Sequence, residues 1–479
     1  MASAFDQNAE TQRESITGTA LSELKAQRPI LLPLLAMNLT WFAKTIITTA
    51  FLGRLGELSL SGSALGFTFA NVTGFSVLNG LSYAVEPICG QAFGAKNFKL
   101  LHKTLSMASL LLLFVSVPIA LLWLNVDKIL LRFGQREDVS AVAETYVTYL
   151  LPDLVVTSFL CPLKLYLTAQ NMTLPIMFCT AFGVALHVPL CVFLSNAMGV
   201  KGISMAFWIT DFVILVTLLF YVATTECLDG KVWKEGGWFD HGRRDDWISL
   251  LKLAFPCCLT TCLEWWCYEI LVFLTGNLPN AERSLAVLAI VLNFDYLLFS
   301  VMQSLSTCAS IRISNELGAG NADRAFTSSR ISLGLGVLSG ILGGAAMAMA
   351  RGFWGALFSR ESGVVQGVKK MMLIVAVMEV VNFPVAVSGG IVRGTARPWL
   401  GTYASICGFY MLALPLGVVL AFKIHLGLAG LLAGFVAGVA VCLVVLLLFI
   451  GGINWDEESR KAQALAGGSG DDNIISRVD

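Results

Sequence analysis

The sequence has little charge for its size. Only 13% of its 479 residues are Asp, Glu, Lys or Arg, whereas soluble globular proteins have about 25%. Thirty-two basic side chains against 32 acidic ones leave no formal net charge, which removes the electrostatic basis for binding a nucleic acid. The composition therefore argues against an ordinary soluble protein and against a nucleic-acid partner.

Two kinds of site are also missing from the sequence. No segment has the G-x-x-x-x-G-K-[ST] pattern of a phosphate loop, so ATP does not drive the protein directly. Cys258 and Cys262 share a helix face, but no His or acid at ligand spacing completes a zinc set. Catalytic clusters are absent as well. We therefore expect no metal, no organic cofactor and no enzyme activity.

Long apolar segments are what the sequence does have. Leu105–Leu124, Ile331–Ala350 and Leu426–Ile450 each run for about 20 residues with few or no charges, enough to cross a hydrocarbon core. We predict an all-α membrane protein with twelve spans. They are expected at 30–52, 62–85, 104–126, 143–163, 174–197, 203–224, 248–276, 285–309, 327–351, 368–388, 400–422 and 427–451.

The spans divide the chain into two lobes with polar segments around them. The predicted parts are an N-terminal tail (1–28), an N-lobe (29–224), a connector (225–247), a C-lobe (248–451) and a Gly- and Asp-rich tail (452–479) expected to be disordered. Loops on the side of the two termini are richer in Lys and Arg, which places both termini in the cytoplasm. The sequence does not decide the cellular location, which is either the plasma membrane or an internal membrane (vacuole, Golgi or late endosome).

An internal repeat relates the two lobes. At a shift of 224 residues, Phe75–Ser82 aligns with Phe299–Ser306, and Gly94–Asn97 aligns with Gly318–Asn321 in the same register. Six spans per lobe is an even number, so both lobes enter and leave the membrane on the same side. The repeat is therefore parallel, with a pseudo-two-fold axis along the membrane normal, as in transporters whose lobes rock about a central site.

Three motifs carry a family resemblance. Glu86–Asn97, Ser314–Asn321 and Gly389–Pro398 resemble the signature segments of multidrug and toxic compound extrusion (MATE) transporters, and the Asn-Glu-Leu-Gly-Ala-Gly form is similar to the plant branch. The resemblance covers about 29–452 of the chain. It implies a V-shaped pair of six-helix bundles that exports organic compounds against an inward flow of protons or Na⁺.

Glycines of these motifs have a structural interpretation. Gly94, Gly318 and Gly320 are predicted at cytoplasmic helix ends, where a positive φ ends a helix. The glycines within Leu333–Gly344, which lie outside these motifs, are expected to let helices pack closely.

Ionisable side chains within spans are costly and indicate functional sites by default. They are Lys44, Asp211, Glu264, Glu269, Asp295 and Glu379. The first-half counterparts of Glu264, Glu269 and Asp295 are all uncharged, so we expect acid chemistry to be concentrated in the second half. For Asp211 we expect polar packing in the bundle.

Glu264 is the favoured proton-coupling residue. By the resemblance, Glu264 and Glu269 match paired acids of the seventh helix, but five residues turn a helix by about 500°, so the two side chains point about 140° apart. Desolvation in a dry pocket penalises the carboxylate and lets it hold a proton. Trp265 and Trp266 either stack on a flat substrate or pack against lipid and helices.

Elsewhere the sequence departs from the family. Asn382 falls where many eukaryotic members have a tenth-helix acid, and Glu379, one turn earlier, is a possible substitute. Asp295 lies two residues past the eighth-helix acid position. Lys44 replaces the first-helix Asp of bacterial members; it either contacts the carboxylate of a substrate or extends to the outer interface.

We therefore predict a proton-coupled antiporter for a small organic metabolite or xenobiotic, with H⁺ favoured over Na⁺. The coupling candidates are Glu264, Glu379, Glu269 and Asp295, and the substrate-binding candidates are Trp265, Trp266, Asn382 and Lys44. The partners are the substrate, protons and the lipid bilayer, and we expect a monomer. A passive anion channel and a lipid flippase of related architecture are the alternatives.

Overall fold

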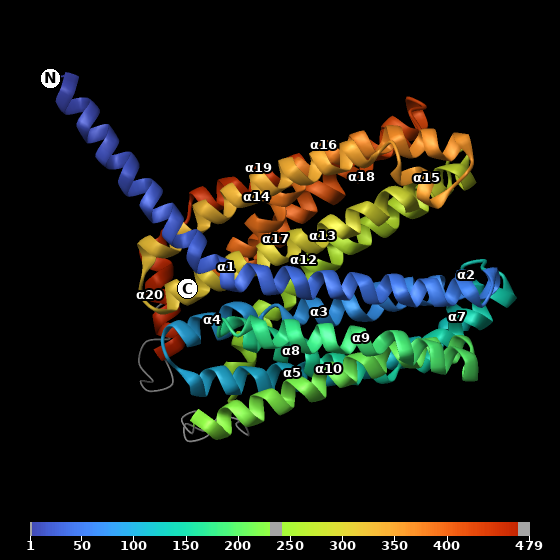
Figure 1. Ribbon diagram of the computed structural model, residues 1–479, viewed down its shortest axis with the longest axis horizontal. Coiled ribbons are helices and arrows are strands. Elements are labelled where there is room, and N and C mark those ends of the chain that lie inside the picture. The colour runs from blue at the N-terminus through green and yellow to red at the C-terminus, as the bar shows by residue number, and fades with distance from the viewer. Residues whose placement is uncertain (1, 230–241, 468–479) are drawn as a thin grey trace.

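The computed structural model describes residues 2–229 and 242–467. Within these ranges every regular element is a helix, and most helices run along one common direction as two bundles that lie side by side (Figure 1). The predicted connector at 225–247 falls between the two bundles, and its residues 230–241 lie outside the described ranges.

Helices up to α10 form the first bundle. They are α1 (Ala2–Arg54), α2 (Glu57–Ala70), η1 (Asn71–Phe75), α3 (Ser76–Ser82), α4 (Val85–Gly94), α5 (Phe98–Trp123), α6 (Val126–Arg132), α7 (Glu137–Leu150), α8 (Pro152–Ala169), α9 (Thr173–Met198) and α10 (Val200–Asp229).

The second bundle begins after the connector. Its elements are α12 (Arg244–Gly276), α13 (Ala281–Gly318), α14 (Ala322–Ala350), α15 (Trp354–Phe358), α16 (Ser362–Gly394), α17 (Pro398–Ser405), η2 (Ile406–Ala413), α18 (Leu414–Val418), η3 (Val419–Lys423) and α19 (Leu428–Gly451), followed by α20 (Trp455–Gly467).

The predicted spans appear as long apolar helices. In the described part of the chain, ten are each long and apolar enough to cross a membrane, and α7 with α8, bent by 50°, forms an eleventh. The bend falls at Pro152, whose ring lacks the N–H that would continue the helix. The remaining predicted span is broken into α2, η1, α3 and α4, which follow one another along the first bundle (Figure 1). The predicted all-helical fold of two six-span bundles is confirmed.

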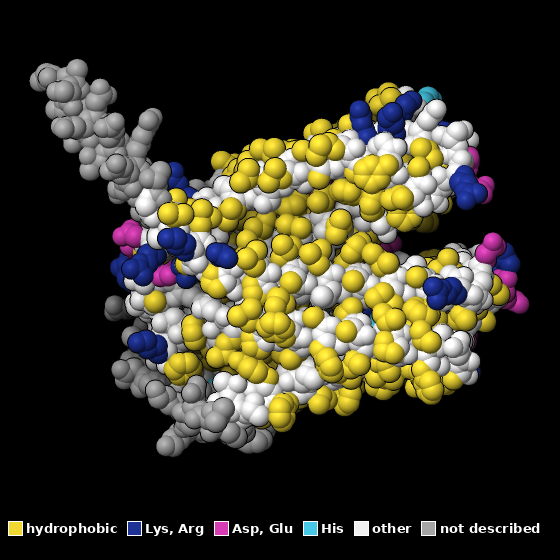
Figure 2. Space-filling model, viewed as in Figure 1, with side chains coloured by type: hydrophobic (Ala, Val, Ile, Leu, Met, Phe, Trp, Pro, Cys, Tyr) yellow, Lys and Arg dark blue, Asp and Glu magenta, His cyan; other side chains and the backbone are white. Residues whose placement is uncertain are grey.

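Apolar side chains cover the outside of both bundles. Figure 2 shows them along the full length of the visible face, with charged side chains gathered at the two ends. Phe114, Phe193 and Leu448 are more than 70% exposed, which is the arrangement expected of a surface that faces lipid rather than water. At the end away from α20, a deep gap separates the two bundles (Figure 2).

The internal repeat is visible in the backbone. Three pairs of residues with positive φ occupy equivalent turns of the two lobes. The φ values within each pair agree closely, and the largest difference is between 60° and 82°. The pairs are Lys96 and Gly320, Asn171 and Ala396, and Gly199 and Gly427. Because left-handed turns are rare outside glycine, this recurrence supports the parallel relation of the lobes.

The motif glycines differ in part from the prediction. Gly320 has a φ of 82°, as expected, but Gly94 and Gly318 are the last residues of α4 and α13 and have no positive φ. They lie where the two lobes cross: a Cβ on Gly318 would fall 2.1 Å from the carbonyl oxygen of Gln91, and one on Gly94 would fall 2.1 Å from that of Asn315. Their role is close approach of two helices rather than helix termination.

Close packing by the glycines of α14 is confirmed. A Cβ on Gly344 would lie 2.5 Å from the carbonyl oxygen of Ala376, and one on Gly340 would lie 3.0 Å from that of Val380. Both contacts are with α16, so α14 and α16 approach one another through the glycine face of α14.

The C-terminal tail corrects a second prediction. Trp455–Gly467, expected to be disordered, forms helix α20, and residues 468–479 lie outside the described ranges. Arg397 pairs with the buried Glu458 of α20, and Asn97 of the first lobe donates to the carbonyl oxygen of Ala466. α20 therefore contacts both lobes at the end where they meet.

Candidate functional site

Each lobe contains a cluster of ionisable side chains in its membrane-spanning part. In the first lobe, Lys44 on α1 forms an ion pair with Asp211 on α10 at 2.7 Å, and its Nζ lies 3.5 Å from the centre of the Phe207 ring. Lys44 is only 1% exposed. It therefore does not extend to the membrane interface, and Asp211 packs within the bundle, as expected, with Lys44 as its polar partner.

Two members of this cluster were missed by sequence reasoning. Asp153 and Lys164 both lie on α8, and both border the same cavity as Lys44 and Asp211. Asp153 is 1% exposed, and its Oδ1 has no hydrogen-bonding partner in the described part of the chain. The expectation that acids concentrate in the second half is therefore incomplete, because this cavity of the first lobe has two acids of its own, accompanied by two bases.

A sequence pattern that indicates both residues is a polar stripe, a row of polar side chains spaced at three or four positions, which places them on one face of a helix. Asp153, Thr157, Cys161, Lys164 and Thr168 recur every three or four residues, so they share one face of α8. All five line the cavity. In the sequence, Lys164 falls just beyond the predicted end of the fourth span at 163, but α8 continues to Ala169.

The first-lobe cavity has a volume of about 230 Å³. Besides the α8 stripe and the Lys44–Asp211 pair, aromatic rings form much of its wall. Two of them, Trp265 and Phe299, come from the second lobe and pack edge to face with ring centres 6.4 Å apart. Their repeat counterparts Trp41 and Phe75 also line the cavity. The cavity therefore lies against the interface of the lobes.

In the second lobe, Asp295 on α13 and Glu379 on α16 are in contact through their carboxyl groups. Glu379 is 0% exposed and Asp295 5% exposed. Neither oxygen of Glu379, nor Oδ1 of Asp295, receives a hydrogen bond from a donor within the described ranges. Asn382, 6% exposed and one turn along α16, is a polar neighbour of Glu379. The geometry thus brings Glu379, Asp295 and Asn382 together.

The paired acids of α12 separate as their spacing predicts. Glu264 is half-buried and lies within electrostatic range of Asp295 and Arg393. Glu269 lies near Tyr296 instead. Glu264 therefore belongs to the second-lobe cluster and Glu269 stands apart from it.

Trp265 and Trp266 take different positions. Trp265 lines the first-lobe cavity, whereas Trp266 is 39% exposed and donates its indole N–H to the carbonyl oxygen of Val72, 3.1 Å away in the first lobe. Of the predicted substrate-binding residues, Lys44 and Trp265 thus border the same cavity, while Trp266 joins the lobes and Asn382 lies with the acids.

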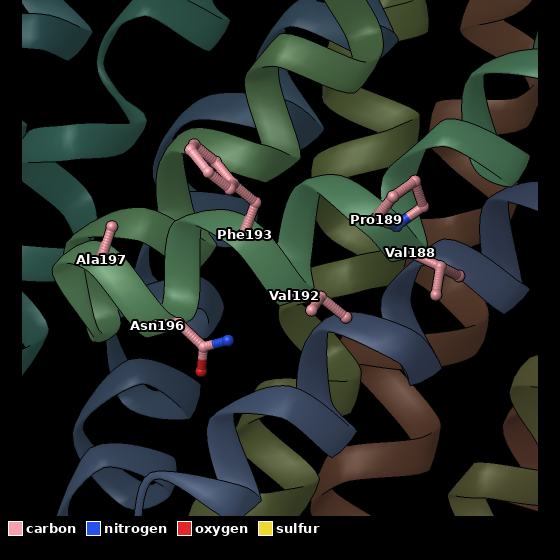
Figure 3. A pocket seen from close by; sticks show the side chains of 6 residues that line it. All are labelled: Val188, Pro189, Val192, Phe193, Asn196 and Ala197. Atoms are coloured by element: carbon pink, nitrogen blue, oxygen red, sulfur yellow. The ribbon is translucent and has the colours of Figure 1, made fainter.

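A second depression lies on the outer surface of α9. Figure 3 shows the side chains that line it: Val188, Pro189, Val192, Phe193, Asn196 and Ala197. They are apolar except for Asn196, and Phe193 is 73% exposed. None of these six lining residues is ionisable, and the depression opens to the outside of the bundle rather than between the lobes.

Ion pairs join the lobes at the α20 end. Glu86 of α4, 0% exposed, pairs with Arg393 of α16 at 3.2 Å, and Glu23 of α1 pairs with Arg312 of α13 at 2.9 Å. Arg393 also lies 4.8 Å from the ring centre of Tyr83. These contacts close the α20 end, whereas the lobes are apart at the opposite end (Figure 2).

Two helical bundles that meet at one end and enclose buried ionisable groups define a membrane transporter of the two-lobe type. The family model "MatE" matches residues 33–193 and 256–419, one segment in each lobe. The chain belongs to this family, the MATE transporters, and is a secondary transporter and not an enzyme.

Individual relatives agree. The chain is 57% identical to Protein DETOXIFICATION 56 of Arabidopsis thaliana over 453 residues, which covers 94% of this chain and 92% of that protein. It is 39% identical to Protein DETOXIFICATION 49 of the same plant, with coverage of 93% and 89%. The crystal structure of the eukaryotic MATE transporter AtDTX14 matches with a TM-score of 0.88 at 30% identity, covering 94% of this chain and all of that one. The Vibrio cholerae MATE transporter VcmN in its bent form shares the fold with a TM-score of 0.80 at 17% identity, covering 94% of this chain and 99% of that one.

Proposed function

We propose that the protein is a proton-coupled antiporter, which exports a small organic compound in exchange for protons by alternating access of its two lobes. The observation that carries the proposal is the contact between Asp295 and Glu379. Two carboxyl groups this close in a dry site are stable together only when one of them holds a proton. Without it, two like charges would share a buried site in which neither oxygen of Glu379 accepts a hydrogen bond within the described ranges.

This arrangement provides for proton release as well as binding. Water that reaches the pair solvates the carboxylates and favours the loss of the proton, and closure around the pair favours its return. Glu264, within electrostatic range of Asp295, adds a further acid near this path. Coupling then requires only that the bound proton has a different free energy in the two states of the lobes.

Alternating access is supported by the asymmetry of the two ends. The Glu86–Arg393 pair closes one end while the other is open between the lobes (Figure 2), so no open pore runs through this state. We place the closed end and both termini in the cytoplasm, because the loops there are richer in Lys and Arg. We further propose H⁺ rather than Na⁺ as the coupling ion, a monomer as the working unit, and the plasma membrane or an internal membrane as its location.

The test is transport by the purified protein in proteoliposomes, with and without an imposed pH gradient. Radiolabelled tetraethylammonium, benzoate and a neutral analogue, benzamide, serve as probes. We expect the gradient to drive accumulation of at least one probe, and we expect Glu379→Gln to abolish that accumulation while the protein still inserts and folds.

Glu269→Gln is the matched control, since Glu269 is an acid of the same lobe that stands apart from the pair. It should retain most of the gradient-driven transport. Normal exchange by Glu379→Gln would mean that the coupling acid is elsewhere. Fast flux without counter-transport would show a channel, and movement of labelled phospholipid in place of the probes would show a flippase.

A further inference from the structure

The mechanism above uses the acids of the second lobe and leaves the charged cavity of the first lobe without a role. Helix packing alone does not explain charged side chains at this cavity, because burying an ionisable group in a membrane-spanning bundle costs free energy. Four such groups border one cavity of about 230 Å³: Lys44, Asp153, Lys164 and Asp211. What these groups bind is therefore a question separate from proton coupling.

Their charges are not all compensated. Lys44 and Asp211 satisfy one another at 2.7 Å. The ammonium of Lys164 has neither an ion pair nor a hydrogen bond with any residue in the described ranges, although Lys164 borders the cavity. Asp153 leaves one carboxyl oxygen without a partner among the described residues. The ammonium of Lys164 is the group that a ligand can neutralise, since a buried cation is stabilised most by an anion in contact with it.

The position of Lys164 suits such a contact. It lies on the cavity face of α8, and a helical side chain leans toward the N-terminus of its helix, here along the polar stripe toward Cys161 and Thr157. Lys44, by contrast, is held by Asp211 and covered by the Phe207 ring. Lys164, rather than Lys44, is thus the base available to a ligand.

The walls and size of the cavity limit what the rest of the ligand is. Aromatic side chains from both lobes border it, among them Trp41, Phe67, Phe75, Trp265 and Phe299. Its volume is below the range of about 300–1,000 Å³ typical of sites for drug-sized molecules. Aromatic walls favour a flat apolar group with ring contacts, and the volume limits that group to a small one.

We propose that the first-lobe cavity binds a single-ring aromatic carboxylate, whose carboxylate pairs with Lys164 while its ring packs against the aromatic wall. This names a substrate class for the antiporter and in that respect rests on the proposed function. The Lys44–Asp211 pair is then a fixed structural element of the site, and the ligand contributes the anionic partner that Lys164 lacks.

Equilibrium binding tests the proposal without any gradient. The probe is radiolabelled benzoate, and the protein is the purified full-length chain in nanodiscs of neutral phosphatidylcholine. We expect saturable binding that unlabelled benzoate competes and that benzamide and benzyltrimethylammonium do not. Lys164→Gln should weaken binding by about tenfold or more, the effect of losing a bond to a charged group, and Lys164→Arg should retain most of it.

Lys369→Gln is the control, because Lys369 is exposed on α16 and does not border the cavity; it should bind as the unmodified protein does. The competition by benzamide needs no variant, so it decides the matter even if Lys164→Gln fails to fold. Absence of saturable benzoate binding, equal competition by benzamide, or unchanged binding in folded Lys164→Gln would each overturn the proposal.

The outcome is separable from that of the proposed function. Intact benzoate binding with no proton-driven transport of any probe would refute the antiporter and leave the site standing. Proton-driven transport of tetraethylammonium with no benzoate binding would refute the site and leave the antiporter standing.

Discussion

The two lobes share one backbone plan but hold opposite kinds of polar centre. In the first lobe, two bases and two acids border a cavity, and the central pair, Lys44 and Asp211, is complete in itself. In the second lobe, Asp295 and Glu379 meet without a base between them, and within the described ranges neither oxygen of Glu379 accepts a hydrogen bond. Two lobes with the same fold can therefore have different functions, and it is their buried charged residues, not their folds, that differ.

The equivalent helices make this contrast specific. Asp153 and Glu379 lie in the fourth spans of their respective lobes, on α8 and α16. Asp295 replaces Asn71, its counterpart at the repeat shift, which borders the first-lobe cavity. At this repeat position the first lobe thus has a neutral amide that lines the cavity, and the second lobe has a carboxyl group. That carboxyl group is one half of the acid pair to which we assign proton binding.

The largest effect is expected from Asp295→Asn, which restores the first-lobe residue type at the equivalent position. An amide donates to Glu379 without a proton being bound, so the pair no longer exchanges protons with water. Gradient-driven transport in proteoliposomes should fall to background, while Asn293→Ala, nearby on α13, should keep most of it. Substantial gradient-driven transport by Asp295→Asn would contradict the claim that the second lobe binds the coupling proton through the carboxyl group of Asp295.

The next effect concerns the first-lobe pair. Lys44→Met leaves Asp211 buried and unpaired, and removing one partner of a buried ion pair costs about 3–5 kcal/mol. We expect a large drop in the thermal unfolding temperature measured in detergent. The double variant Lys44→Met with Asp211→Leu should recover most of the loss, because no uncompensated charge is left. A double variant as unstable as the single one would show that the charges do more than neutralise each other.

A smaller effect is expected where the lobes cross. Gly318→Ala places a Cβ 2.1 Å from the carbonyl oxygen of Gln91, so the helices must separate slightly. We expect a loss of about 1–3 kcal/mol, the usual cost of overpacking. Gly334→Ala on α14 is the control, as nothing lies within 4 Å of its Cβ. Equal melting temperatures for the two variants would show that the crossing tolerates separation.

The smallest effect is expected at α20. Arg397 is 36% exposed, so its ion pair with Glu458 is partly solvated and is expected to contribute about 1 kcal/mol or less. Arg397→Gln should therefore lower the unfolding temperature only slightly and leave transport nearly unchanged. A loss comparable to that of Lys44→Met would mean that α20 holds the lobes together far more strongly than this contact indicates.

Sequence reasoning was reliable for features that depend on local pattern. The spans follow from apolar length, and the parallel relation of the lobes follows from an even number of spans in a repeat. The divergence of Glu264 and Glu269 follows from helix geometry alone. These features need no knowledge of which helices are neighbours.

Features that depend on tertiary neighbours were not accessible. Lys44 and Asp211 are 167 positions apart, and nothing local shows that they meet or that Asp295 reaches Glu379. Asp153 and Lys164 were accessible in principle through the polar stripe on α8. Lys164 was missed because the predicted fourth span ended at 163, whereas Asp153 lay inside that span and was overlooked. α20 was missed because the average composition of 452–479 concealed the charged, Ala-containing segment Trp455–Gly467.

The central claim is that Asp295 and Glu379 share a proton in the state with the α20 end closed. Infrared difference spectroscopy of the protein in lipid, recorded as the pH is raised, reports this proton through the C=O band of a protonated carboxyl group. The account predicts a band that disappears on deprotonation, is absent in Glu379→Gln and persists in Glu269→Gln. A band unchanged by Glu379→Gln, or lost only in Glu269→Gln, would contradict it.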